Sequence, residues 1–517
     1  MIYYEDFGAR GDGKTNDFLA MQAAHKRANE TGEDVLATPG KCYYINELNG
    51  EPITIKTNTS WQGAKIIIDD TYLSGGSPET YPKCEIFSVE NDYPTLFLDE
   101  TNPYIAALNE NRPVIKKNGE TKRLDLGLGY PAFLMVYNDE NTQYKRGGFV
   151  DHGAPQKELI VIDEKGNIDE MTPVLFDYEK ITRIEVVRID TKPITIEGGD
   201  ITTLASRVHN EEGGYREVAH GLLVSRPNTT VKGVKHYIEN QLAKGEIING
   251  VPFYGDSVGG FFKTSFTSNV EFRDCFATGR VMYGASYEII LSHSNDVRLV
   301  NVKQSEENYN RIKDWWIMGS NFCKNISYDG CYLTRFDAHC GVYNVTIKNS
   351  TVASLRLTGG GDFIIENSTV KTKSYGGDTF IMLREDYGST WRGNIYIKNC
   401  VFDSIFDDRK YETVTLIWAE WRNYDFGYKT YMPNVYVDNL SFAEKLGTKC
   451  VELFDITNRD EGCPNVRAFS EDSVLGEVNK NVYTPPKLVS IKNCDTGVDF
   501  SLADCEFLKD TELHYEK

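Results

Sequence analysis

The sequence predicts an all-β fold, a parallel β-helix, from a short repeat, from the spacing of its copies and from an N-terminal capping segment. The repeat reads apolar–x–apolar–x–Asn, Asp or Gly, which alternates as a β-strand does and ends at a turn residue. Copies begin at Val270, Val297, Ile326, Val345, Phe363, Ile395, Val435 and Val489. Strands that cannot bury their inner face alone must stack, one coil on the next.

The spacing of the copies fits such coils. The shortest gaps, from Ile326 to Val345 and from Val345 to Phe363, are 19 and 18 residues. That is near the minimum for three short strands and three turns, and longer gaps indicate inserted loops. Asn and Asp tolerate the left-handed backbone of a turn, and their side chains can bond to the equivalent residue one coil away.

Looser copies occur earlier, at Ile53, Ile194 and Val231, and the pattern dissolves between about residues 70 and 190. We therefore expect a single β-helix domain over residues 1–517, with an insertion or a small β subdomain at 70–190. Cysteine follows the turn residue in four copies, at Cys275, Cys331, Cys400 and Cys494. We interpret these cysteines as a column of small packed residues rather than a thiol or metal site.

The N-terminal segment carries a Gly/Asp turn followed by Thr15-Asn16-Asp17, which can cap a helix. Leu19, Met21, Ala24 and Ala28 then mark a short amphipathic helix, which suits a cap over the open end of a solenoid. Residues 8–15 also satisfy the phosphate-loop pattern G-x-x-x-x-G-K-[ST]. A phosphate loop needs a parallel sheet alternating with helices, whereas this chain shows stacked strands.

The stretch DFGARGDGKTNDFLAMQAA, residues 6–24, resembles the opening of the pectate-lyase-like, right-handed β-helix superfamily. That superfamily includes polygalacturonase-type glycoside hydrolases, polysaccharide lyases and phage tailspikes. The resemblance implies a carbohydrate substrate and a cleft along one sheet of the helix. The paired aspartates followed by Gly-His-Gly that mark polygalacturonases are not found, so no catalytic residue is carried over.

The charge of the chain limits the classes of binding partner that can be expected. The net charge is −20, the pI is about 5, and the chain has no Lys/Arg run. We therefore expect no nucleic-acid and no membrane partner. The chain starts at Met1 without a basic segment or an apolar leader. We expect a cytoplasmic protein, or a secreted one if a leader is removed from a longer precursor.

Candidate catalytic residues lie in one strand-like row. If Phe336, Ala338 and Cys340 point inward, Arg335, Asp337 and His339 share the outer face. On the next coil Leu355 and Leu357 point inward and Arg356 points outward. Asp337 and Arg356 each lie seven residues past a turn residue, so they should stack at roughly 4.8 Å along the helix.

Neighbouring coils extend the row. With Ile381 and Leu383 inward, Arg384 and Asp386 point outward, and Glu385 stands where the strand ends. Trp418 and Glu420 follow one coil later, and Trp316 comes one coil before Asp337. Aromatic rings stack on sugars, and arginines bond hydroxyl or carboxylate groups. We expect substrate binding by Arg335, Arg356, Arg384, Trp316, Trp418 and Glu420.

Two carboxylates are the usual minimum for glycoside hydrolysis. Asp337 and Asp386 lie two coils apart, about 9–10 Å between backbones, and leaning side chains reach the roughly 6.5–9.5 Å of an inverting pair. We expect a glycoside hydrolase acting on oligo- or polysaccharides without a cofactor. Asp386, or Glu385, would be the acid and Asp337 the base, or the reverse, with His339 tuning the pKa of Asp337 or binding substrate.

Two alternatives stay open. A polysaccharide lyase would use the arginines against a uronic acid, with Ca²⁺ held by an acidic pair such as Asp69-Asp70 or Asp407-Asp408. A non-catalytic tailspike or adhesin would bind saccharide only. A homo-oligomer also stays open.

Overall fold

The repeats form parallel strands that stack one coil on the next, as the sequence predicts. In the computed structural model, the third repeat position forms a buried column through Ile347, Ile365, Ile397, Val437 and Ile491, each paired with the next. Each such apolar side chain contributes about 1.5–3 kcal/mol by leaving water. The described residues form a right-handed parallel β-helix, with its core inside the coils.

The structure describes residues 1–73, 84–110, 113–117, 119–146, 152–205, 220–241, 246–248, 251–253, 260–278, 287–309, 317–372, 379–404, 410–421, 426–458, 484–494, 499–501 and 508–516. Two compact units can be distinguished. The first comprises residues 1–94, 188–311 and 315–319; the second comprises 95–187, 312–314 and 320–517. Trp316, one of the expected sugar platforms, lies outside the described residues.

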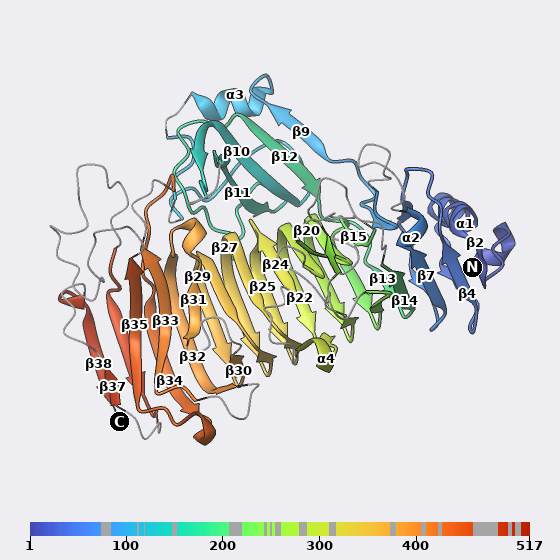
Figure 1. Ribbon diagram of the computed structural model, residues 1–517. Coiled ribbons are helices and arrows are strands. Elements are labelled where there is room, and N and C mark those ends of the chain that lie inside the picture. The colour runs from blue at the N-terminus through green and yellow to red at the C-terminus, as the bar shows by residue number, and fades with distance from the viewer. Residues whose placement is uncertain are drawn as a thin grey trace. The chain divides into compact units, whose positions relative to one another are not determined.

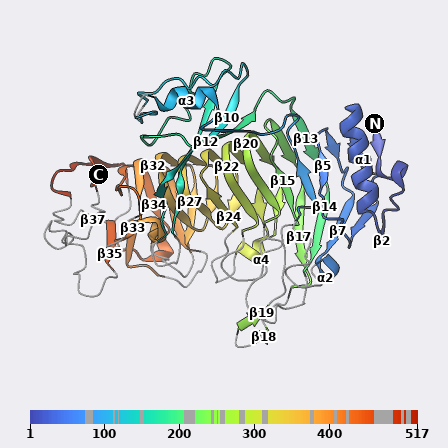
Figure 2. The ribbon, with the colours of Figure 1, turned by 90° about the horizontal axis from the view of Figure 1, so that it is seen from above.

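The first unit contains the capping segment and the early coils. Its elements are β1 (Ile2–Tyr3), η1 (Tyr4–Phe7), β2 (Asp12–Asn16), α1 (Phe18–Thr31), β3 (Val35–Leu36), β4 (Cys42–Ile45), β5 (Ile53–Ile55), β6 (Thr59–Ser60), β7 (Lys65–Asp69), α2 (Asp70–Leu73), β8 (Phe87–Val89), β13 (Ile194–Glu197), β14 (Asp200–Leu204), β15 (Leu222–Val224), β16 (Thr229–Lys232), β17 (Lys235–Glu239), β18 (Glu246–Ile248), β19 (Val251–Phe253), β20 (Phe262–Arg273), β21 (Phe276–Ala277), β22 (Ile289–Val300), β23 (Lys303–Gln304) and α4 (Glu306–Tyr309). Helix α1 lies against β5 (Figure 2). Among the described residues, no helix is long and apolar enough to cross a membrane.

The capping segment forms as expected, with one difference in its buried face. Met21, Ala24 and Ala28 are buried together with Phe18, whereas Leu19 is 60% exposed, because the helix starts one residue before it and turns Leu19 to solvent. The phosphate-loop pattern has a structural use instead. The Asp12 carboxylate accepts hydrogen bonds from the backbone N–H groups of Lys14 and Thr15. A bound phosphate would need these same N–H groups as donors.

The second unit contains the later coils, which follow one another in chain order (Figure 1, yellow to red). After β24 (Met318–Asn321), which crosses the boundary, come β25 (Lys324–Asp329), β26 (Tyr332–Leu333), β27 (Phe336–Lys348), β28 (Thr351–Val352), β29 (Leu355–Glu366), β30 (Thr369–Thr372), β31 (Thr379–Leu383), η2 (Glu385–Tyr387), β32 (Trp391–Ser404), β33 (Thr413–Trp421), β34 (Asn434–Phe442), η3 (Glu444–Leu446), β35 (Cys450–Asn458), β36 (Leu488–Lys492), β37 (Asp499–Ser501) and β38 (Glu512–Glu516).

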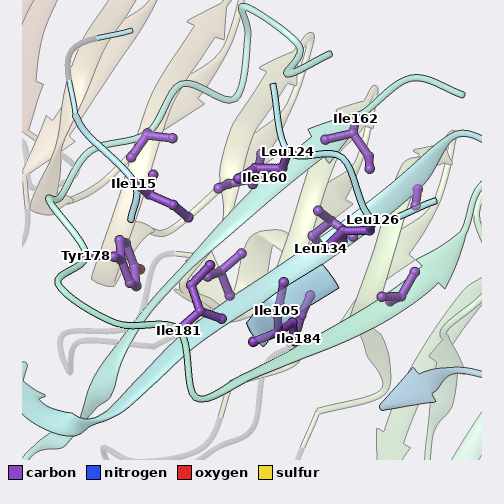
Figure 3. Packing of buried hydrophobic residues seen from close by; sticks show 14 residues of the cluster. Ile105, Ile115, Leu124, Leu126, Leu134, Ile160, Ile162, Tyr178, Ile181 and Ile184 are labelled. Carbon is purple, nitrogen blue, oxygen red and sulfur yellow. The ribbon is translucent and has the colours of Figure 1, made fainter. Parts of the chain in front are cut away.

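A four-stranded antiparallel sheet is inserted before these coils and belongs to the same unit. It comprises β9 (Leu96–Asp99), β10 (Ala132–Gln143), β11 (Ala154–Ile162) and β12 (Arg183–Arg188), with helix α3 (Pro103–Asn109). Strand β8, inside the expected insertion, pairs with β5 and β15 of the coils. The inserted sheet has its own apolar core, in which Leu134 of β10, Ile160 of β11 and Ile184 of β12 pack with Ile105 of α3 (Figure 3).

The turn residues stack as the sequence predicts. Asn399 donates from Nδ2 to Oδ1 of Asn367 at 3.1 Å, and Asn439 donates to Asn399 at 3.0 Å. Asn367, Asn399 and Asn439 all have positive φ, between 51° and 62°. The cysteines that follow the turns are free; the Cys400 thiol donates to a backbone carbonyl of its own turn, and burial raises its pKa to about 11. These thiols therefore act as packing residues.

Candidate functional site

The predicted row of charged residues forms a buried chain of ion pairs in the second unit. Asp337 accepts hydrogen bonds from Nη2 of Arg335 at 2.5 Å and from Nη1 of Arg384 at 2.8 Å. The same Arg384 donates through Nε and Nη2 to Asp386, at 3.0 and 2.7 Å. Arg146, which follows strand β10 of the inserted sheet, donates to Asp386 at 2.8–2.9 Å. One guanidinium group therefore bridges the two carboxylates that the sequence singled out.

These pairs set the charge of both carboxyl groups. Burial alone would raise the pKa of Asp337, but the guanidinium groups of Arg335 and Arg384 outweigh burial and hold that pKa below its usual range. Burial is likewise outweighed at Asp386, where hydrogen bonds from Arg384 lower the pKa. Both groups are therefore ionised at neutral pH. A general acid must carry a proton, so this geometry argues against the acid role expected for Asp386.

His339 lies beside the ion pairs, and its Nδ1 donates to Oδ1 of Asn321 at 2.9 Å. Burial, followed by the positive charge of Arg384, lowers the pKa of His339 to about 4, so the ring is neutral at pH 7. We expected Cys340 to point into the coil, but it packs with Tyr387 and with Tyr144, the residue that follows β10. The cause is a register irregularity in β27 between Ala338 and Val342, which reverses the faces to which the following side chains point.

The stacking prediction for the next coil is confirmed: Asp337 pairs in register with Arg356, and Leu355 and Leu357 are buried. Further along, β31 ends at Leu383, so Asp386 lies on the 3₁₀ helix η2 with Glu385 rather than on a strand. Trp418 lies partly exposed on β33, in register with Met382. Glu420, expected outside, is fully buried, and its backbone N–H donates to Oγ of Ser389.

A cleft of about 850 Å³ lies elsewhere in the same unit, between the inserted sheet and the coils of β27, β29 and β32. None of Arg335, Asp337, Arg384 or Asp386 lines it. Its lining is aromatic, amide-bearing and charged, with a run of glycines. The lining includes the side chains of Lys117, Gln143, Tyr144, Glu170, Phe176, Asp177, Tyr343, Thr358, Asp362, Arg392, Asn394, Tyr428, Lys429 and Tyr431.

Glycine residues form a part of the lining on the coils. Gly360 pairs in register with Tyr343 on one side and with Arg392 on the other, so these two side chains flank a position with no side chain. A Cβ at Gly361 would come within 2.7 Å of the Tyr343 ring, so glycine makes room for that ring on the sheet. Gly361 also has a φ of +79°, which glycine adopts at little cost.

One wall of the cleft is held in place by a buried carboxylate. Glu158 of β11 accepts hydrogen bonds from the backbone N–H groups of Leu175 and Phe176, at 2.9 and 3.2 Å. Lys324 of β25 donates to Glu158 at 3.1 Å and to the carbonyl of Pro173 at 2.7 Å. Burial lowers the pKa of Lys324, and the Glu158 carboxylate opposes that shift. The pair fastens residues 173–176 to the coils.

Four charged side chains of the cleft are engaged by other groups of the protein. Lys117 lies 2.8 Å from Asp177, and its hydrogen bonds, aided by the charge of Arg392, lower the pKa of Asp177. Arg392 donates to the carbonyl of Leu175 at 3.3 Å, and its guanidinium group lies 5.3 Å from the Tyr431 ring centroid. Asp362 accepts a hydrogen bond from Asn394 at 2.8 Å.

Sequence reasoning missed this cleft because many of its residues come from the insertion, whose strands carry no repeat. One signal was present: Thr358-Gly359-Gly360-Gly361-Asp362 places three glycines inside a strand, a pattern typical of close backbone approach. The acidic pair Asp69-Asp70 is engaged, since Asp69 accepts from Tyr44 and Thr71, and Asp70 contacts His220 at 2.7 Å. Asp407 and Asp408 lie outside the described residues. Within the described ranges, no three His, Cys, Asp or Glu side chains gather as metal ligands.

No protein-family model matches the chain. Among solved structures, the chain is similar to the gp54 tailspike of Acinetobacter baumannii bacteriophage AP22 in complex with A. baumannii capsular saccharide, with a TM-score of 0.53 at 9% identity, over 100% of this chain and 79% of the tailspike chain. The Pseudomonas phage phi297 tailspike gp61 gives a TM-score of 0.49 at 12% identity, over 88% and 80% of the two chains. The Streptococcus pneumoniae surface protein and adhesin PfbA gives 0.43 at 12% identity, over 88% and 100%. At such identities the likeness concerns the fold, and the superfamily resemblance of the N-terminal motif stays a prediction.

Proposed function

We propose that this chain binds an oligosaccharide segment of a polysaccharide in the cleft beside the inserted sheet. The observation that carries the proposal is the cleft itself: about 850 Å³, with a tyrosine ring on a glycine surface and polar side chains around it. Saccharide sites combine ring faces with hydrogen-bonding groups, and this volume falls within the range of small-molecule sites. The AP22 tailspike, which has this fold, holds a capsular saccharide, so capsular glycans belong in the first ligand panel.

Binding to a glycan array, with the parent chain and two tyrosine variants, tests the proposal. Tyr343→Ala should weaken binding at least about tenfold, because the ring is an aromatic anchor of the cleft. The matched control is Tyr396→Ala, a tyrosine of β32 that stacks on Tyr436 at 4.7 Å and does not line the cleft. Equal affinity of the two variants for every glycan bound by the parent would count against the cleft.

We further propose that the bound saccharide is hydrolysed. Hydrolysis needs one carboxyl that donates a proton and one that is ionised. The cleft offers Asp177, held ionised by Lys117, and Asp362, which Asn394 orients. Asp337 and Asp386 are the sequence-derived alternative, although arginines engage both. The Asp177–Asp362 pair is favoured because both residues line the cleft.

Mass spectrometry of products from the array-positive glycans distinguishes the activities. Products heavier by one water indicate hydrolysis, and unsaturated products without added water indicate the lyase alternative. Asp177→Asn and Asp362→Asn should then each lower the rate by about 10²–10⁴-fold, as expected for acid–base residues. Asp438→Asn, on the surface of β34, should keep the parent rate. Binding without any product would leave the chain a saccharide-binding protein.

A further inference from the structure

We propose that the cleft selects an uncharged saccharide, one that presents hydroxyl or amide N–H groups to Gln143 and Thr358 and carries no carboxylate there. The proposal rests on the proposed saccharide binding and deepens it by naming the ligand class. It stands on two buried polar atoms beside the cleft and on the balance of charge in its lining.

The first observation concerns hydrogen-bonding groups with no protein partner. Gln143, at the end of β10, is 5% exposed, and within the described part of the chain no donor reaches its Oε1. Thr358 of β29 is 1% exposed, and its Oγ1 likewise has no partner among those residues. Both residues line the cleft. Buried polar atoms are seldom left without a partner, so we infer that both side chains turn toward the cleft when a ligand supplies the missing partner.

The chemistry of the Gln143 amide oxygen excludes a carboxylate at that position, whereas the Thr358 hydroxyl accommodates either kind of group. An amide oxygen only accepts hydrogen bonds, and an ionised carboxylate only accepts them as well. A uronate oxygen against Gln143 would therefore meet an acceptor, whereas a sugar hydroxyl or an N-acetyl N–H donates to it. The Thr358 hydroxyl both donates and accepts, so it suits a sugar hydroxyl equally well.

The second observation concerns charge. The lining contains three cations, Lys117, Arg392 and Lys429, and three carboxylates, Glu170, Asp177 and Asp362, so their formal charges cancel. Lys117 is paired with Asp177 at 2.8 Å, and Arg392 already contacts Leu175 and the Tyr431 ring. A uronate would have to compete with Asp177 for Lys117, inside a chain of net charge −20. An uncharged saccharide meets no such competition.

Matched ligands test the selection directly. The probes are neutral oligosaccharides on the array and the same oligosaccharides oxidised to the carboxylate at C6, measured at 50 and 300 mM NaCl. We expect the neutral member of each bound pair to bind at least about tenfold more tightly, with little change between the two salt concentrations. Tighter binding of the oxidised member, weakened by salt, would overturn the selection while leaving saccharide binding intact. No binding to either member of any pair would overturn the proposed function itself.

Two variants test the two atoms. Gln143→Met and Thr358→Val each remove an unpartnered polar atom while keeping most of the side-chain volume. Each should weaken binding of the neutral glycan by about three- to tenfold, as loss of one hydrogen bond does. The thermal midpoint of the free protein should stay the same or rise, a combination that a purely structural role would not give. The control is Gln22→Met on α1, outside the cleft lining. Parent affinity in both cleft variants would overturn the assignment of these atoms.

Discussion

Asp337 is a fully buried carboxylate whose charge is balanced by two buried arginines. Its partners Arg335 and Arg384 are 0% and 6% exposed. Removing one partner of a buried ion pair costs about 3–5 kcal/mol, because the other charge stays buried and uncompensated. We therefore expect Asp337→Asn to lower the apparent free energy of unfolding by that amount, measured by urea denaturation followed by circular dichroism at pH 7.

The matched control is Asp438→Asn. Asp438 lies 3.4 Å from Lys492, with both side chains at least 34% exposed. Exposed pairs contribute about 0–1 kcal/mol, so this variant should unfold almost as the parent does. If the two variants lost the same stability, the buried chain of ion pairs would have no special structural role. Activity measured on folded Asp337→Asn would separate that role from catalysis.

At the scale of the element, the asparagine turns between coils combine a left-handed backbone conformation with side-chain hydrogen bonds from one coil to the next. Asn399 has a φ of 51° and takes part in two ladder bonds, to Asn367 and from Asn439. Alanine in the left-handed region costs about 1–2 kcal/mol, and each exposed hydrogen bond contributes about 0.5–1.5 kcal/mol. Asparagine satisfies both requirements at once, which explains its recurrence at the end of the repeat.

Two substitutions at Asn399 separate these contributions. Asn399→Ala should lower the free energy of unfolding by about 2–4 kcal/mol, because it loses the ladder bonds and strains the backbone. Asn399→Gly keeps the backbone relaxed and should cost about 1–2 kcal/mol less. The measurement is urea denaturation of the two variants beside the parent. Equal losses in both would show that the backbone conformation contributes nothing measurable.

The same elements show what a sequence can predict here. Val345, Phe363, Ile395 and Val435 share one repeat position and pair in register, because the pattern encodes both the strand and its turn. Inward positions were right at Leu355 and Leu357, whereas Glu420 of β33, expected outside, is fully buried. The inward assignment failed at Cys340, next to a register irregularity in β27, and Asp386 lies on η2 because the strand has ended. The cleft escaped prediction because contacts between an insertion and distant coils leave no local period.

Across the whole molecule, acid should destabilise the fold through groups that differ in pKa between the folded and unfolded states. Burial lowers the pKa of His25 in the first unit to about 3 and that of His339 in the second to about 4, against 6.5 for an ordinary histidine. Between pH 6.5 and 4 the unfolded chain binds protons at these histidines and the folded chain does not. Stability must therefore fall as the pH falls through this window.

Below pH 4 the stability continues to fall with falling pH, but for a different reason. Asp337 and Asp386 have lowered pKa values in the fold, so the unfolded chain takes up protons there first, and the stability they contribute above their ordinary pKa of 3.8 is lost. We expect the apparent free energy of unfolding to decrease continuously from pH 6.5 to pH 3. Urea denaturation at half-unit steps of pH measures this profile.

A single histidine variant identifies the source of the slope above pH 4. Each depressed histidine contributes up to about 1.4 kcal/mol per pH unit. His339→Gln keeps a donor for Asn321 and removes the titrating ring, so the slope between pH 6.5 and 4 should flatten by up to that amount. His514→Gln, at an exposed position on β38, should leave the profile unchanged. A parent-like slope in His339→Gln would mean that this ring is protonated in the folded protein, and the neutral, buried imidazole beside Asp337 would have to be abandoned.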